Sequence, residues 1–537
     1  FRRVRRLRTL RDPAQIYVHG QQPLRAESRV RAGKKVAVDE VEIAARPLGA
    51  AHIIQRQQNA PEHLCVQMPF AVRVQAAGRH GRQMIDGHLR LRNAVRRGES
   101  AKKRVVPVQD LNLHKASQLL PLYEAIVKDA AEALTHCGFH TPNHRWAIAS
   151  VLMMCHRLLG GEAYKKAADA ILLEGSDCNA DGEYAERSAG NYNRINNDAM
   201  IMLAVATGDD AYYEPVVRNL TMMLTYIEPD DSIFTNNSTR QDRGRKIYPK
   251  DYYFEYLYMG DVLQKPEFLD AANEIMAAVD RHGLKAMDCL IQFMLQPRLA
   301  ALEHAGSGFP ADYHKFYKGS EIVRCRRKGY SYTIINHSAG FLYFQNGDFT
   351  VSMHIGASFC EHRSFIPETL ASTGENAYAL HQTMTGWYYL PFEEKPETSD
   401  WWKMDHTKRA QLHGPDMIFD VEVTEAENGI DVHIVNTGID RAPLRVELAF
   451  DAGCRVETEH FAADGAEGGG IVAKSGTLTA SRGRYAIEAG PCFGAHGFTA
   501  GKFGSMKRTE GCYTVYLTDF SCFEHTISLR AKPSLHD

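Results

Sequence analysis

The sequence lacks a run of about 20 apolar residues, which is the length that a membrane-spanning helix requires. No apolar core of a signal peptide follows its opening arginines, although the first residue is Phe1 and a processed or truncated start stays open. Its eleven cysteines are scattered, and no Cys-x-x-Cys pair occurs among them. These absences exclude a zinc ribbon and a disulfide scaffold, and they favour reduced thiols in a cytoplasmic protein.

An excess of charge of either sign is also missing. Lysine and arginine total 63, aspartate and glutamate total 65, and the net charge is −2. The balance of the whole chain is therefore no argument for or against a polyanionic partner. Hydrophobic residues make up 44% of the 537 residues, which is usual for a soluble protein of two or three domains. We expect neither a nucleic acid nor a membrane as partner, and the oligomeric state stays open.

Residues 1–108 form an atypical segment that is rich in arginine, poor in lysine and poor in apolar periodicity. The segment can be a basic arm that binds a polyanion. It can also have no role in catalysis, being disordered or not native coding sequence. We assign no fold to it and place the folded domains at 109–305 and 306–537.

Helical periodicity fills residues 109–305. In 117–137 apolar residues recur at three- and four-residue steps, and Gly138 then ends the predicted helix. Thr141 and Pro142 are typical of a helix start, and Gly160–Gly161 ends this second helix. Short connections favour antiparallel helix pairs in a bundle, solenoid or toroid, and the lack of a fixed repeat weakens the open solenoid. Further helices are predicted at 162–173, 195–206, 210–227, 251–263, 266–281 and 284–296.

Beyond residue 320 the apolar period changes to two, which predicts strands. Gln345–Asp348 contains the Asn-Gly pair of a hairpin turn. Helices followed by strands indicate separate layers, so the fold class is multidomain, all-α and then a large antiparallel β-sandwich. The predicted strands are 330–335, 340–344, 349–354, 418–423, 430–435, 444–448, 485–488, 513–517 and 526–529.

A polar segment, Pro-Asn-His-Arg-Trp at 142–146, lies at the start of the second predicted helix, and we call it the first station. Asn143 and His144 fall in the first turn of the predicted helix, where free backbone N–H groups and the positive end of the helix dipole favour an anion. An amide or an imidazole placed there can hold a carboxylate. The alternative is a capping asparagine beside a surface histidine.

A second station is Asp-Gly-Glu-Tyr-Ala-Glu-Arg-Ser-Ala-Gly-Asn-Tyr at 181–192. Tyr192 follows a glycine into a predicted helix, so its phenol can point into a cavity. A phenol with the usual pKa near 10 is a poor base unless a cation or a donor lowers that pKa, and Arg187, Arg194 or His144 could do so. The alternative is a tyrosine that anchors one helix to its neighbour.

The two stations together, Asn-His-x-Trp and then Asp-Gly-x-Tyr-x-Glu-x-Ser-x-x-x-Tyr, resemble the heparinase II/III-like polysaccharide lyases across residues 110–420. The resemblance implies an incomplete (α/α) toroid followed by a β-sandwich, and β-elimination on glycosaminoglycan-like glycans of 4-linked uronic acids. By this resemblance Asn143 neutralises the uronate carboxylate, Tyr192 is the catalytic tyrosine, and His337 is the histidine of the β-domain, with His354 and His362 as rivals. No organic cofactor is implied, and the region of His337 has no His-x-His pair that would support a structural metal.

Two more groups suit an acidic sugar. The polar segment 234–244 carries Arg240 and Arg243 and either binds the sugar or is a solvated connector. Trp387, Trp401 and Trp402 could stack on sugar rings, although core packing is the more usual role for at least one of them.

The expected reaction removes the C5 proton of the uronate with His337 or ionised Tyr192, and Tyr192 donates a proton to the departing O4. One rival is a glycoside hydrolase on an (α/α) barrel, with Asp181, Glu183 and Glu186 as candidate carboxylates. Three acids within one short segment cannot easily flank a glycosidic bond. The other rival is a non-catalytic carbohydrate-binding protein of the same fold.

Overall fold

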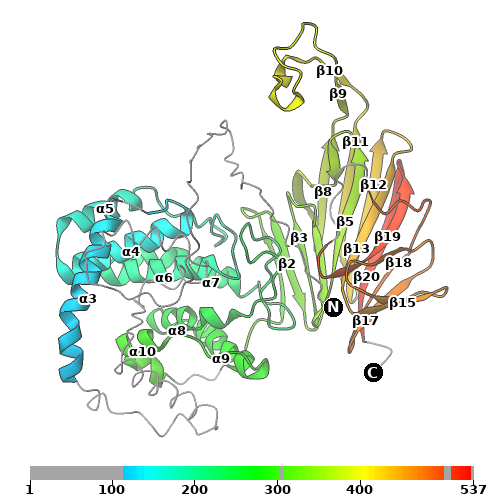
Figure 1. Cartoon of the computed structure of the whole chain (residues 1–537). Coiled ribbons are helices and arrows are strands. Elements are labelled where there is room, and N and C mark those ends of the chain that lie inside the picture. Colours follow the sequence, from blue (N-terminus) through cyan, green and yellow to red (C-terminus); the bar gives the residue numbers. More distant parts are fainter. Residues whose placement is uncertain (1–112, 137, 303–305, 307, 501–508, 534–537) are drawn as a thin grey trace, which may run out of the picture.

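All α-helices of the described chain precede its strands. The structure, a computed structural model, describes residues 113–136, 138–302, 306, 308–500 and 509–533. Figure 1 shows the helices in one domain and the strands in a second domain beside it. The predicted order of an all-α part and a β-sandwich is therefore confirmed, and the segment 1–108 lies outside the described residues.

The helical domain consists of antiparallel pairs. Helix α4 packs against α5 and α6, α6 against α7, and α8 against α9. Their shared core includes Trp146, Tyr256 and Phe268. Such pairs are the unit of a toroid, and the incomplete (α/α) toroid itself stays a prediction. The helices are α3 (Leu113–Leu134), α4 (Pro142–Leu159), α5 (Glu162–Leu172), α6 (Tyr192–Thr207), α7 (Tyr213–Met223), α8 (Tyr253–Val262), α9 (Pro266–Arg281) and α10 (Leu290–Leu295).

The strands form two large sheets that face each other. All strand pairs within them are antiparallel except β16 with β19. The first sheet runs in the order β1 (Asp312–Tyr317), β2 (Ile322–Arg327), β3 (Tyr330–Ile335), β4 (Leu342–Asn346), β5 (Phe349–Phe359), β13 (Pro443–Asp451), β19 (Cys512–Phe520) and β16 (Gly470–Val472), with β6 (His362–Ser364) beside β5. The second runs β15 (Ala462–Gly465), β14 (Cys454–Glu457), β17 (Leu478–Arg482), β18 (Tyr485–Gly490), β20 (Phe523–Pro533), β12 (Gly429–Gly438), β11 (Met417–Ala426), β8 (Ala377–Met384) and β7 (Thr369–Gly374).

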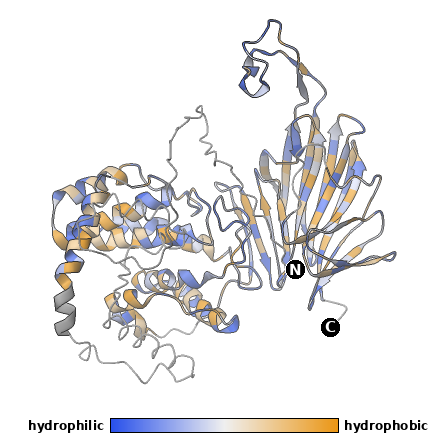
Figure 2. Ribbon diagram, in the orientation of Figure 1, coloured by the Kyte–Doolittle hydropathy of each residue, from blue (hydrophilic) through white to orange (hydrophobic). Residues whose placement is uncertain are grey.

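The core of the sandwich lies between the two sheets. Phe344 and Leu448 from the first sheet and Phe419 and Ile527 from the second belong to one buried cluster. Figure 2 shows the alternation of apolar and polar residues along these strands. This alternation is the period-two pattern by which the sequence predicts β3, β5, β11 and β12.

The outer face of the first sheet packs on the helical domain. Ile322 and Ile335 belong to the core cluster of the helices rather than to the sandwich core. Strands β2 and β3 are therefore covered on both faces and show almost continuous burial. A strand that is buried on both faces need not alternate. Ile-Val-Arg-Cys-Arg-Arg in β2 shows no regular apolar alternation, so the sequence predicts no strand there, whereas Tyr-Ser-Tyr-Thr in β3 keeps it.

A buried ion pair joins the two domains. The Arg324 side chain on β2 is fully buried, and its Nη1 lies 2.8 Å from Oε1 of Glu228, which follows α7. Its Nε donates to the backbone oxygen of Thr225 at 2.9 Å, and the Tyr313 hydroxyl on β1 donates to the same oxygen at 2.7 Å. The guanidinium thus binds both a charge and a backbone carbonyl of the helical domain.

We predict that Arg324→Met lowers the free energy of unfolding by about 3–5 kcal/mol, because it leaves the Glu228 carboxylate buried without a countercharge. Urea unfolding measures the loss. The double variant Arg324→Met with Glu228→Gln should recover part of it, since the unpaired charge is removed. Arg441→Met is the control, because this arginine is exposed and its ion pair with Asp440 contributes little. An equal loss in the control would contradict the role of the buried pair.

Candidate functional site

Two connectors between helices carry most of the polar residues that the sequence singled out. The first connector, residues 173–191, joins α5 to α6, and the second connector, residues 224–248, joins α7 to η5 (Pro249–Tyr252) and α8. Both touch the first sheet. Ser320 donates its backbone N–H to Asp181 of the first connector at 2.8 Å, and the ring of Phe234 in the second lies 5.5 Å from that of Tyr343 on β4. The connectors therefore lie at the junction of the two domains.

Asn143 and Tyr192 belong to one contiguous group, which we call the Asn143–Tyr192 cluster. Asn143 lies in the first turn of α4 and is buried, and its Nδ2 donates to both carboxylate oxygens of Glu186, at 2.9 and 2.7 Å. Glu186 pairs in turn with Arg240, whose Nε lies 3.3 Å from Oε1. The Arg240 guanidinium lies over the Tyr192 ring, with Cζ 4.9 Å from the ring centroid. An amide, a carboxylate, a guanidinium and a phenol are thus consecutive neighbours.

Asp242 holds the backbone around this cluster, and sequence reasoning missed it. Its carboxylate accepts from the Ser188 hydroxyl and from the Gly190 backbone N–H, each at 2.9 Å. It also accepts from the Ser238 hydroxyl at 2.6 Å. The Ser188 oxygen in turn accepts from the Tyr192 N–H at 3.1 Å. One carboxylate therefore fixes both the start of α6 and the loop that carries Arg240, and nothing in its sequence context indicates this.

His144 lies beside the cluster. Burial lowers the pKa of its imidazole, the Arg240 charge lowers it further, and the Glu186 charge opposes both. The Nδ1 atom lies 2.6 Å from the Thr141 hydroxyl. This contact explains why Thr141, at the N-cap of α4, makes no side-chain capping bond. The ring therefore has a fixed orientation and can accept or donate one proton.

Glu183 is the second buried carboxylate of the first connector. Burial raises its pKa to about 7, against the opposing charge of Arg187. Asn237 donates to its Oε1 at 2.9 Å and the Tyr226 hydroxyl at 3.4 Å. Glu183 consequently changes its protonation near neutral pH, although its oxygens are enclosed by side chains of the second connector.

The four arginines that the sequence singled out as groups that could bind the acidic sugar or lower the pKa of Tyr192 have different surroundings. Arg240 belongs to the Asn143–Tyr192 cluster, and Arg187 pairs with Glu183, its Nε lying 3.3 Å from Oε2. Arg243 is exposed on the second connector, and its charge acts on Tyr343 and His354 of the first sheet. Arg194 instead pairs with Asp198 one turn along α6, at 2.8 Å.

The histidines of the β-domain differ in exposure. His337 has a side chain that is 54% exposed and lies 3.1 Å from Glu321 Oε2. Its φ of 56° is unusual for a residue with a side chain. His354 on β5 is buried, and a Cβ on Gly340 would lie 3.0 Å from its ring. The loop that carries His337 thus packs over His354. His362 lies on the short strand β6.

Trp387 lies on a projecting arm. The two-stranded ribbon of β9 (Trp387–Tyr389) and β10 (Gln411–His413) extends from one end of the sandwich, away from the helical domain (Figure 1). Trp401 packs there on His406, and Trp402 is exposed. The arm also carries an open hollow of about 570 Å³. The three tryptophans are therefore not part of the Asn143–Tyr192 cluster.

Comparisons with known proteins give likenesses of fold only. No family model matches the chain, and no curated protein matches it significantly. Among solved structures it is similar to a heparan sulfate lyase mutant from Pedobacter heparinus, with 11% identity, 78% of this chain and 61% of that chain covered, and a TM-score of 0.39.

Two further solved structures are similar. A xanthan lyase from Paenibacillus gives 10% identity and a TM-score of 0.48. The similarity covers 76% of this chain and 45% of that chain. A chondroitin AC lyase from Streptomyces coelicolor A3, in complex with chondroitin sulphate, gives 11% identity and a TM-score of 0.42. The similarity covers 78% of this chain and 66% of that chain. This chain thus spans 45% to 66% of the length of these proteins. They are polysaccharide lyases, the class that the two sequence stations resemble, and at such identities the chemistry of this chain must be argued from its own residues.

The burial of His354 predicts a pH dependence of stability. Burial, aided by the charge of Arg243, lowers its pKa from 6.5 to about 4. Between these values the unfolded chain binds a proton that the folded chain does not. Stability therefore falls by about 3 kcal/mol as the pH falls from 6.5 to 4, and is unaffected by this group at higher pH.

Urea unfolding at a series of pH values checks this prediction. His354→Gln should give a profile that is flatter than that of the wild type by this amount. His362→Gln, on the neighbouring strand, is the control and should keep the wild-type slope. Equal slopes for the wild type and His354→Gln would contradict the burial argument.

Proposed function

We propose that this protein is a polysaccharide lyase that cleaves 4-linked uronic-acid glycans of the glycosaminoglycan kind by β-elimination. The observation that carries the proposal is the Asn143–Tyr192 cluster, in which Asn143 and Arg240 bind Glu186 and Arg240 lies over the Tyr192 ring. β-Elimination next to a carboxylate needs a group that binds this carboxylate and a group that transfers protons. An amide with a guanidinium supplies the first, and a phenol supplies the second.

Carboxylate binding is the part that the cluster supports most directly. Glu186 already demonstrates that Asn143 and Arg240 together hold a carboxylate at this position. The amide nitrogen of Asn143 carries two hydrogens, so one can be shared between the Glu186 oxygens while the other binds the uronate. Removal of the C5 proton places negative charge on that uronate, and donors that are already oriented stabilise this charge without reorganisation.

Proton transfer is assigned to Tyr192 and a histidine. A base takes the C5 proton, the C–H electrons form the C4–C5 double bond, the C4–O4 bond breaks, and Tyr192 gives its proton to O4. The phenolate that remains lies under the positive charge of Arg240, which favours it. Solvent then returns a proton to the phenolate and takes the C5 proton from the protonated base. No organic cofactor takes part in this sequence of steps.

His337 is the proposed base, because a base must reach a proton on a bulky glycan. Its ring is more than half exposed, whereas His354 is buried beneath the loop that carries His337. Glu321 lies 3.1 Å from the His337 ring and can stabilise the imidazolium that forms. The left-handed backbone of His337 agrees with a functional position, since such strain is concentrated at active sites.

We predict that Tyr192→Phe lowers kcat by about 10²–10⁴-fold, because the departing O4 loses its proton donor. The measurement is the ultraviolet absorbance of unsaturated uronate in digests of hyaluronan, chondroitin, heparan and alginate. Oligosaccharide binding should be nearly unchanged, since the ring under Arg240 is kept. Tyr164→Phe on α5, in the same domain, is the control and should keep full turnover.

The same assay separates the rivals. New reducing ends without the chromophore would indicate a hydrolase that uses Glu183 or Glu186. Binding without any cleavage by the wild type would indicate a carbohydrate-binding protein. Full turnover by Tyr192→Phe would contradict the role of the phenol.

A second prediction concerns the base. His337→Gln should lower kcat by about 10²–10⁴-fold with little change in thermal stability, because the side chain is exposed. His354→Gln should change stability more than kcat, because that ring is buried. Parallel measurements of kcat and Tm for the two variants decide between them. A loss of turnover confined to His354→Gln would transfer the role of base to His354.

A further inference from the structure

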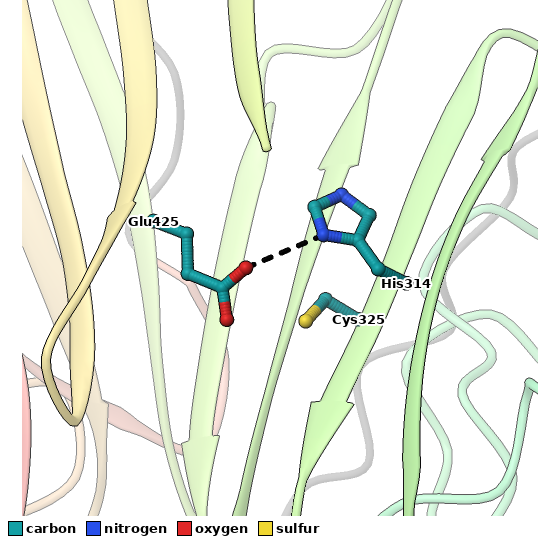
Figure 3. A group of neighbouring side chains, drawn as sticks. All are labelled: His314, Cys325 and Glu425. Atoms are coloured by element: carbon teal, nitrogen blue, oxygen red, sulfur yellow. Dashed lines mark ion pairs between the residues drawn. The ribbon is translucent and has the colours of Figure 1, made fainter. Parts of the chain in front are cut away.

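Three side chains with metal-binding atoms meet outside the proposed active site. His314 on β1 and Cys325 on β2 are direct partners in the antiparallel register, so they point to the same face of that hairpin. Glu425 comes from β11 of the opposite sheet. Figure 3 shows its carboxylate directed at the imidazole, with the thiol beside both. The three residues therefore bridge the two sheets of the sandwich.

Their spacing fits a tetrahedral metal ion. His314 Nδ1 lies 3.4 Å from Glu425 Oε2, and one donor atom from each of the three residues lies within 4.8 Å of the other two. Zinc bound by nitrogen, oxygen and sulfur has bond lengths of about 2.0–2.3 Å, so its ligand atoms lie about 3.3–3.7 Å apart. The nitrogen–oxygen edge already has this length, and the sulfur needs only a small shift of its side chain.

The contact between the imidazole and the carboxylate that faces it is too long for a good hydrogen bond. Among the described residues, Nδ1 of His314 has no hydrogen-bond partner, and 3.4 Å is long for an N–H···O bond to Glu425. The other ring nitrogen, Nε2, lies 2.8 Å from the Tyr378 hydroxyl. In the tautomer that donates from Nε2 to the Tyr378 oxygen, Nδ1 presents a lone pair, and this is the arrangement of a metal-bound histidine.

Arg327 holds the carboxylate in place. Its Nε donates to Glu425 Oε1 at 2.6 Å and its Nη2 to Oε2 at 3.1 Å. Each carboxylate oxygen has two lone pairs, so Oε2 can still bind a metal ion. Because Arg327 already balances the charge of Glu425, a divalent ion needs an anionic sulfur as well. Burial raises the pKa of the Cys325 thiol to about 12, so the bound ion must displace the thiol proton, which leaves to solvent.

We propose that His314, Cys325 and Glu425 bind a zinc ion, with the fourth position taken by water. The bound ion connects the β1–β2 hairpin to the second sheet. The opposite face of the same hairpin carries Tyr313 and Arg324, which bind the helical domain. The site therefore stabilises the sandwich at its contact with the helices, and sequence reasoning missed it because the three ligands are far apart along the chain and form no short motif.

The test uses the full chain, from which any histidine tag has been removed. The purified protein is dialysed against a buffer that contains zinc. Elemental analysis should find about one tightly bound zinc ion per chain, and the unfolding midpoint should rise with zinc concentration. The cobalt-loaded protein should show a thiolate-to-cobalt charge-transfer band. His314→Gln, Cys325→Ser and Glu425→Gln should each lose the bound zinc, and Cys325→Ser should also lose this band.

Cys492→Ser is the matched control, because Cys492 is another buried thiol of the same sandwich core. It should keep the zinc, the band and the shift of the midpoint. If a ligand variant does not fold, the titration of the wild type with zinc and cobalt still decides. Absence of bound zinc and of a midpoint shift in the wild type would overturn the proposal, as would a charge-transfer band that survives in Cys325→Ser.

Discussion

The arrangement of this molecule depends on a charge that is buried where its two domains meet. Arg324 has no exposed surface, so its position is acceptable only while Glu228 and the Thr225 carbonyl surround it. Both partners lie at the start of the second connector, which continues to Arg240 and Asp242. The anchoring pair therefore fixes the connector at one end, and Asp242 fixes it at the other through Ser188 and Gly190. The geometry of the proposed site therefore depends on the ion pair of Arg324 and on the contacts of Asp242.

Ion pairing with arginines also explains why two glutamates of the first connector can both be buried. Glu183 and Glu186 are both buried, yet each has an arginine within 3.3 Å and at least one amide donor. Arg187 and Arg240 differ in what else they touch, since only Arg240 covers the Tyr192 ring. A uronate that arrives beside Arg240 meets a guanidinium whose charge is already shared with Glu186. Its binding must consequently rely on the oriented amide as much as on net charge.

Much of the fold could be predicted from local pattern, and the failures have physical causes. The start and end of α4 followed from Pro142 and Gly160, because proline fixes φ at a helical value and glycine readily adopts the positive φ that ends a helix. Strand β2 could not be predicted, since a strand that is buried on both faces need not alternate and its residues show no regular apolar alternation. Asn143 and Tyr192 stood out by their positions at helix starts. Asp242 did not, because its three partners lie up to 54 residues away and only the folded chain brings them together.

The β1–β2 hairpin shows how one element can serve two environments. Successive side chains of a strand point to opposite faces, so Tyr313 and Arg324 face the helices while their neighbours His314 and Cys325 face the second sheet. A movement that repositions one face necessarily repositions the other. The hairpin is also hydrogen-bonded to β3, whose end leads into the loop of His337. The amide and the phenol come from the helical domain, and the proposed base comes from this sheet. The distance between the base and the other two groups therefore depends on how the hairpin packs against the helical domain. An ion bound between His314 and Glu425 would act on the position of the hairpin from the face that points away from the helical domain.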